Sequence, residues 1–167
     1  MRWVGQLGAT LFVFTCCFGC GDSERECTPG PSAPEMAIRD LEQAPDSLIV
    51  AGQRYSLAIV AYRNGMPILG PPHPRPLNIV VRIVATGAGL FPNSVRPMYV
   101  WAINMQDVWG TSLRDGSRTD LPTNEREFSA SCGPEWTPGI NVDVVLQVAG
   151  AEPRLVITRG VPVRVAE

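Results

Sequence analysis

The sequence contains no lysine and a single histidine, and these two shortages exclude several kinds of chemistry. A Schiff-base mechanism, a phosphate-binding loop with its lysine and a Ser–Lys dyad all require a residue that is missing. His73, the one histidine, lies among prolines, where we expect an exposed loop side chain rather than a positioned base. No G-x-S-x-G nucleophile frame is present. The sequence therefore predicts no catalytic residue and no cofactor.

Charge is also scarce, at 18% of residues with a net charge of −2. No basic field is available to attract nucleic acid, so nucleic acid is not an expected partner. Five acidic residues lie between Gln106 and Glu127, but they lack the oxygen ligands at alternate positions that a calcium loop needs. With one histidine in the chain, a histidine-based metal site is not expected either.

The N-terminus carries a long apolar run, from Trp3 to Phe18, behind Met1 and Arg2. A positive end, an apolar stretch and small residues before a cut site are the parts of a secretory signal peptide. A membrane-spanning helix needs about 20 apolar residues, so this run is short for one. A retained transmembrane anchor is the alternative.

The end of this run resembles the lipobox of bacterial lipoproteins, in which an aliphatic residue and two small residues precede a lipid-modified cysteine. Cys20 follows Cys17, Phe18 and Gly19, of which Gly19 fits the pattern and the other two depart from it. The resemblance implies a signal peptide over residues 1–19, lipid on Cys20 and a membrane as partner. Gly21 after Cys20 implies sorting to the outer membrane. A secreted or periplasmic protein without lipid is the alternative.

Assigning Cys20 to lipid leaves Cys27 and Cys132 as an even pair in the mature chain. In an oxidising compartment an even pair predicts a disulfide. Two free thiols or a metal pair are the alternatives.

The mature chain divides by composition at residue 45. Residues 20–45 are rich in Pro, Ser and Glu, which predicts a flexible tether, with a helical turn or an edge strand left open for residues 35–42. Residues 46–167 alternate apolar and polar positions in about seven runs, with a bulge expected at Arg159–Gly160 where the alternation changes phase. The runs cover residues 47–51, 55–62, 78–85, 98–105, 128–132, 141–148 and 155–165. These runs predict an all-β fold, an antiparallel sandwich of immunoglobulin-like size, because no room remains for crossover helices.

Two stretches are similar to bacterial immunoglobulin-like domains. Residues 60–68 run as alternating apolar residues, an Asn64-Gly65 turn, then Pro67 and an aliphatic residue, and residues 140–165 look like a closing hairpin. The chain departs from that pattern in an insertion at residues 70–76 and in lacking the Cys–Trp–Cys spacing of antibody domains. The resemblance implies a scaffold or adhesive role.

Four aromatic residues, Tyr99, Trp101, Trp109 and Trp136, either pack in the core or form a binding surface for an envelope protein or a glycan. The segment from Gln106 to Glu127 is expected to be a long loop and a second place for binding.

The sequence thus favours an envelope lipoprotein that presents a β-sandwich for binding or structural purposes. A hydrolase or carbohydrate-acting enzyme on a β scaffold is one alternative, and it requires two carboxylates facing one cleft. An accessory lipoprotein of an assembly or secretion apparatus is another, and it requires an exposed sheet edge that accepts a partner's strand.

Overall fold

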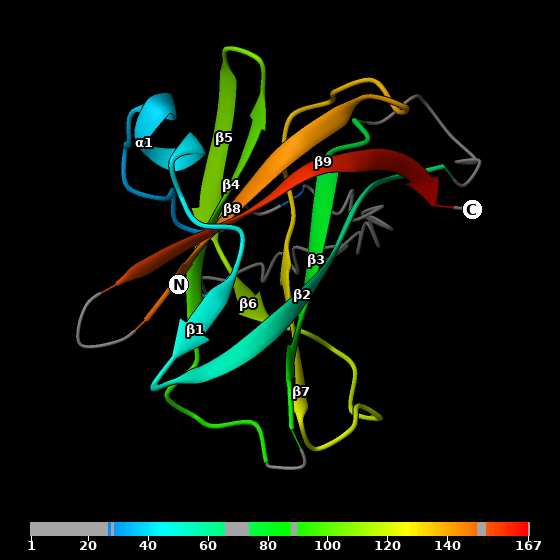
Figure 1. The fold of residues 1–167 in the computed structure, drawn as a ribbon. Helices are drawn as coiled ribbons and strands as arrows, with labels where there is room; N and C mark the ends of the chain where they lie inside the picture. The colour runs from blue at the N-terminus through cyan, green and yellow to red at the C-terminus, as the bar shows by residue number, and fades with distance from the viewer. Residues whose placement is uncertain (1–26, 28, 66–73, 88–89, 150–152, 167) are drawn as a thin grey trace, which may run out of the picture.

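Nine strands and one short helix make up the described part of the chain, which in the computed structural model comprises residues 27, 29–65, 74–87, 90–149 and 153–166 (Figure 1). In chain order they are α1 (Ile38–Glu42), β1 (Leu48–Val50), β2 (Gln53–Asn64), β3 (Leu77–Ala85), β4 (Pro97–Asn104), β5 (Asp107–Ser112), β6 (Arg114–Asp115), β7 (Glu125–Ala130), β8 (Asn141–Val148) and β9 (Arg154–Ala166). The predicted all-β fold is confirmed. The choice left open for residues 35–42 is settled in favour of a helical turn.

The strands form one continuous mixed sheet in the order β5-β4-β8-β9-β2-β3-β7-β6, with β1 paired to β2. Every neighbouring pair is antiparallel except β2 and β9, which run parallel where Ala61 pairs with Val163. Residues 154–162 of β9 pair with β8, and residues 163–166 pair with β2. The sheet therefore bends along β9, and its two halves turn toward each other (Figure 1).

The bulge predicted for Arg159–Gly160 lies just before the point where β9 changes partner from β8 to β2. The register between β8 and β9 shifts between Val142 and Val144, so β9 holds one extra residue there. Gly160 has a φ of 67°, a left-handed conformation that suits glycine, and its N–H donates to Oδ1 of Asp143 at 2.9 Å. The prediction of a bulge is confirmed.

The connection between β2 and β3 differs from the turn predicted at Asn64-Gly65. Arg63 pairs with Leu77, so the two strands are not joined by a two-residue hairpin turn. The N–H of Gly65 instead donates to the carbonyl of Ala166 at 2.7 Å, which extends the pairing between β2 and β9.

One hydrophobic core fills the space between the two halves of the sheet. Along β3 every second residue is buried, as expected for a strand with one face on the core. The opposite half contributes alternate residues of β4 and β8, such as Val100 and Val144, to the same cluster. Burial of these side chains at about 25 cal/mol per Å² is the main term that holds the two halves together.

A second apolar cluster lies on the outer face of β4, β8 and β9. Leu41 of α1 is fully buried there against Trp101, Val145 and Ile157. The carbonyl of Pro45 accepts a hydrogen bond from the N–H of Ile157 at 2.8 Å. Strand β4 is therefore buried on both faces.

Residues 31–34 run along the outer edge of β5. The N–H of Ser112 donates to the carbonyl of Pro31 at 2.8 Å, and the N–H of Ala33 donates to the carbonyl of Gly110 at 3.2 Å. Residues 31–45, which the sequence placed in a flexible tether, pack on the folded body instead. The long loop predicted for Gln106–Glu127 is also wrong in its first part, since β5 and β6 occupy it.

Gly110 permits the closest approach in this region. A Cβ at this position would lie 2.6 Å from Cδ1 of Trp101 and 3.0 Å from Cβ of Ala33. The Trp101 ring is buried and its Nε1 donates to the carbonyl of Pro34 at 3.2 Å, so it has no room to move. We expect Gly110→Ala to lower the free energy of unfolding by about 1–3 kcal/mol, measured by urea denaturation.

The control for that substitution is Ser56→Ala, which alters an exposed side chain of β2 and should change the free energy of unfolding by less than about 0.5 kcal/mol. An equal effect of the two substitutions would contradict the close packing of Trp101 against β5.

Candidate functional site

The predicted disulfide between Cys27 and Cys132 is present, with the two Cα atoms 5.5 Å apart and 105 residues apart in sequence. It joins the start of the described chain to the segment that follows β7. Cys20 and His73, the predicted lipid site and the one histidine, lie outside the described residues.

The four aromatic residues, for which the sequence left core packing or a binding surface open, are not brought together. Tyr99 and Trp101 share the outer face of β4, with ring centroids 6.2 Å apart, and the Trp101 residue is only 2% exposed. Trp109 and Trp136 are half-buried on the other side of the sheet, against the main core. Core packing therefore accounts for Trp101, and only Trp109 and Trp136 border a surface groove.

That groove, which we call the disulfide groove, has a volume of about 460 Å³ and lies beside Cys132. Its lining includes Val108, Trp109 and Trp136, with Asp107 as its one charged residue. Val108 is 38% exposed. The sequence pointed to its two tryptophans but gave no sign that they lie beside the disulfide.

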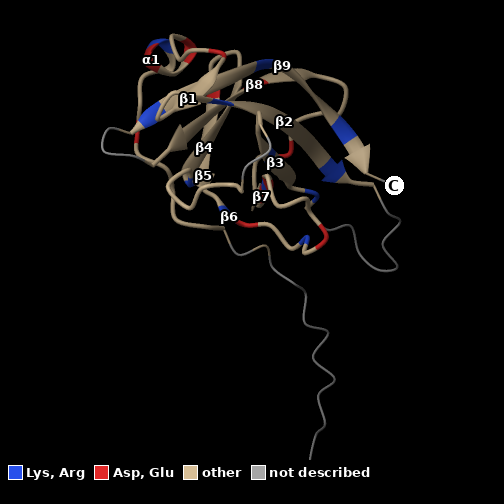
Figure 2. Ribbon diagram, turned by 60° about the horizontal axis from the view of Figure 1, so that its bottom comes forward, with Lys and Arg blue, Asp and Glu red and all other residues tan. Residues whose placement is uncertain are grey.

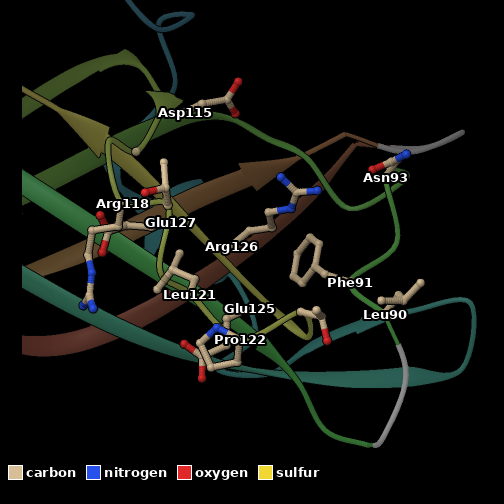
Figure 3. Close-up of a pocket in the computed structure, with 13 residues that line it drawn as sticks. Leu90, Phe91, Asn93, Asp115, Arg118, Leu121, Pro122, Glu125, Arg126 and Glu127 are labelled. Atoms are coloured by element: carbon tan, nitrogen blue, oxygen red, sulfur yellow. The ribbon is translucent and has the colours of Figure 1, made fainter.

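A larger groove of about 580 Å³ lies between the β3–β4 connection and the β6–β7 connection, and we call it the loop-end groove (Figure 3). Its apolar wall consists of Leu90, Phe91, Leu121 and Pro122. Leu90 is 78% exposed and offers apolar surface to a ligand in this groove. The expected binding region of residues 106–127 covers one side of this groove, whereas sequence reasoning missed the side formed by residues 90–93.

Two backbone hydrogen bonds hold the walls of the loop-end groove at a fixed separation. The N–H of Ala85 donates to the carbonyl of Asn124 at 3.0 Å, and the N–H of Phe91 donates to the carbonyl of Thr123 at 2.9 Å. The Phe91 ring also packs edge-on against Tyr55, with centroids 5.9 Å apart, and burial raises the pKa of the Tyr55 phenol. The apolar floor of the groove is thus continuous with the core.

Charges of both signs alternate along residues 114–127, on one side of this groove (Figure 2). Arg82 of β3 lies 3.8 Å from Glu125 and 3.5 Å from Glu127, so these two carboxylates are already paired. Arg118 binds Asp120 through two hydrogen bonds of 2.9 and 3.1 Å.

Arg126 differs from these arginines, because no ion pair involves it among the residues that the structure describes. Its side chain extends from β7 toward Phe91, between the two walls of the loop-end groove (Figure 3). A guanidinium that is exposed and carries five donors without a carboxylate partner is suited to bind an anionic group on a ligand.

The Arg118–Asp120 pair makes a pH-dependent prediction. The hydrogen bonds from Arg118 hold the pKa of the Asp120 carboxyl below its usual range. A lowered pKa in the folded state stabilises the fold above the unfolded-state pKa, and this contribution disappears as the pH falls through the folded-state pKa. We expect Arg118→Gln to return the pKa of Asp120 toward its ordinary value, measured by NMR titration of the carboxyl carbon.

Arg114→Gln, on the neighbouring strand β6, is the matched control for that titration. If both substitutions moved the pKa of Asp120 equally, a general loss of positive charge would explain the shift instead of the bidentate pair.

The two grooves lie at opposite ends of β3. At the Leu77 end, the N–H of Gly133 donates to the Leu77 carbonyl at 3.0 Å, and Gly133 lines the disulfide groove. At the Ala85 end, Asn124 follows directly after Thr123 in the lining of the loop-end groove. Eight residue steps of about 3.3 Å separate the two ends, or about 26 Å.

The described residues contain no group of three or more His, Cys, Asp or Glu side chains placed to hold a metal ion. Within the same residues no helix is long and apolar enough to cross a membrane. Comparison with protein-family models, curated proteins and solved structures finds no significant match to this chain.

Proposed function

We propose that the mature chain is an exported, lipid-anchored binding module without catalytic activity of its own, and that it binds a protein partner in the loop-end groove. The observation that carries this proposal is the groove itself, where an exposed leucine and an unpaired guanidinium border one concavity. Burial of the leucine against a ligand removes apolar surface from water, and the guanidinium can form charge-assisted hydrogen bonds to an anionic group of that ligand.

The strand order supports an immunoglobulin-like sandwich. In that fold the first, second, fifth and fourth strands form one sheet, and the third, sixth and seventh form the other. With β1 set aside and β5 counted as an added edge strand, β2-β3-β7-β6 matches the first sheet and β5-β4-β8-β9 the second. The parallel pair of β2 and β9 joins the two halves at one edge.

The position of the groove fits this fold. The connections from β3 to β4 and from β6 to β7 correspond to loops at one end of an immunoglobulin-like domain, and loops at the ends of such sandwiches carry binding. The two backbone hydrogen bonds between these connections hold the groove open without a ligand, which reduces the entropy cost of binding.

The chemistry of the groove favours a peptide segment that presents an apolar side chain next to a carboxylate. Leu90 and Leu121 offer apolar contact, and Arg126 between them offers the charge. The groove is less suited to a glycan, because sugars stack on exposed aromatic faces. Phe91, the aromatic residue of the groove, is only 6% exposed.

The anchor is supported by the leader, by the lipobox-like cysteine and by Gly21, which together favour an outer-membrane lipoprotein. The mature N-terminus can be determined by mass spectrometry of the chain beside a Cys20→Ala variant. We expect a lipid-modified cysteine that the variant loses, and an unmodified terminus at another residue would contradict the anchor.

The groove is tested by placing the photo-crosslinker p-benzoylphenylalanine at Leu90 in the full chain, expressed in a cell envelope. We expect one protein adduct, and we expect Arg126→Ala to reduce its yield by about tenfold, as the loss of one charge-assisted hydrogen bond of about 1.5–3 kcal/mol allows. Arg164→Ala, at an exposed position on β9, is the matched control and should leave the yield unchanged. No adduct, or equal yields from both variants, would contradict binding in the groove.

A further inference from the structure

We propose that the end of the domain that carries the disulfide groove rests on the lipid bilayer, with the tip of the β4–β5 hairpin inserted at its interface. This inference rests on the proposed lipid anchor at Cys20. It adds an orientation to that anchor: the loop-end groove faces away from the membrane, where a partner can reach it.

The first step is the length of chain between the lipid and the fold. Seven residue steps lie between Cys20 and Cys27, so these two residues can be at most about 25 Å apart. Cys27 is bonded to Cys132, which lines the disulfide groove. The connection from Cys20 therefore enters the folded body at this disulfide. The lipid therefore reaches the bilayer from the disulfide end.

The second step is the opposite placement of the two grooves. The loop-end groove begins about 26 Å farther along β3, at its Ala85 end. The disulfide end is therefore nearer to the lipid than the loop-end groove is. Because the link of up to about 25 Å is comparable with this separation, the surface composition at the disulfide end decides which end contacts the bilayer.

The third step is the composition of the surface nearest the lipid. Met105, at the turn of the β4–β5 hairpin, is 86% exposed, and Val108 on the same hairpin is 38% exposed. Trp109 and Trp136 border the adjoining groove, and tryptophan is enriched where proteins meet the membrane interface. We call Met105, Val108, Trp109 and Trp136 the apolar tip.

Met105 also has a φ of 56°, in the left-handed region that glycine, asparagine and aspartate adopt most readily. Met105 therefore carries two costs: the strained backbone of a non-glycine residue at positive φ, and the exposure of a long apolar side chain to water. Contact with a bilayer removes the second of these costs, at about 25 cal/mol per Å² of apolar surface buried.

The attraction to the bilayer is apolar and not electrostatic. The disulfide groove is lined by Asp107 and by no arginine. A basic surface would bind anionic headgroups in a salt-dependent manner. The apolar tip should therefore contact zwitterionic phosphatidylcholine, and added salt should not weaken the contact.

The test uses the acylated full chain, with Cys20 modification verified by intact mass, in phosphatidylcholine vesicles that contain a lipid with a photoreactive acyl chain. After illumination, tandem mass spectrometry maps the labelled residues. We expect label at residues 105–109 and 134–136 and none at residues 90–93 and 118–122, with the same pattern at high salt.

Met105→Asp should abolish label on the hairpin while the chain remains folded and bound to vesicles, because aspartate tolerates a left-handed φ. Leu90→Asp, an equally exposed position at the other end, should leave the pattern unchanged. Label at the loop end, or on neither end, in an acylated chain would overturn the orientation while leaving the anchor intact. An unmodified Cys20 in a chain that does not bind vesicles would overturn the anchor and this inference together.

Discussion

Replacing Cys27 and Cys132 together by serine should lower the free energy of unfolding by about 2–5 kcal/mol. The two residues are 105 positions apart, so the disulfide removes a large amount of conformational freedom from the unfolded chain. It also fixes the start of the segment that covers the edge of β5. Loss of the bond therefore destabilises the whole domain and frees its N-terminal segment.

The measurement is urea denaturation of the double variant beside the oxidised protein. Cys132 has a φ of 71°, and serine at this position keeps the same backbone strain, so that term cancels in the comparison. Reduction of the unchanged protein with excess dithiothreitol is the matched control and should give the same loss of stability as the double variant. A change below about 1 kcal/mol in both would show that the unfolded chain gains little freedom when the bond is absent.

The strands that alternate apolar and polar residues could be predicted from the sequence, because their pattern reflects one buried face. Along β3 and β8 the expected boundaries agree with the observed ones within one residue. The bulge at Arg159–Gly160 was predictable for the same reason, since an extra residue in a strand shifts the phase of the pattern. The disulfide followed from counting cysteines.

Strand β5 could not be predicted, because Asp107, Gly110 and Ser112 are residue types that strands disfavour. Its structure depends on neighbours that are distant in sequence: β4 on one side and residues 31–34 on the other. The prolines of that segment indicated a tether. Pro31 can nevertheless pair with the edge of β5, because its carbonyl accepts a hydrogen bond from Ser112 and this position requires no N–H donor.

The candidate site was predictable only in part for the same physical reason. A groove is formed by segments that approach in space, and no pattern in the sequence joins Leu90 to Arg126. The tryptophans were visible as large apolar residues, but their two environments, one under α1 and one beside the disulfide, depend on which face of each strand they occupy. A one-residue change of register would exchange those faces.

Leu41→Ala should lower the free energy of unfolding by about 2–5 kcal/mol, the second large effect that we expect. Leu41 is fully buried against Trp101 and Ile157, although it belongs to a helix of only five residues. So short a helix has no stability of its own in water, and its packing on the sheet is what maintains it. The truncated side chain leaves a cavity under α1 that the rigid Trp101 ring cannot fill.

Urea denaturation measures the loss of stability. Hydrogen exchange then shows whether α1 separates from the sheet on its own or whether the whole domain unfolds more readily. The N–H groups of Gln43 and Ala44 donate to carbonyl groups of α1. If α1 separates from the sheet on its own, these two amides exchange faster, while the amide of Val144 in the core does not. Glu42→Ala is the control, because this neighbouring side chain is exposed and its removal should cost less than about 0.5 kcal/mol. Equal effects of the two substitutions would contradict the close packing of Leu41 between α1 and the outer face of the sheet.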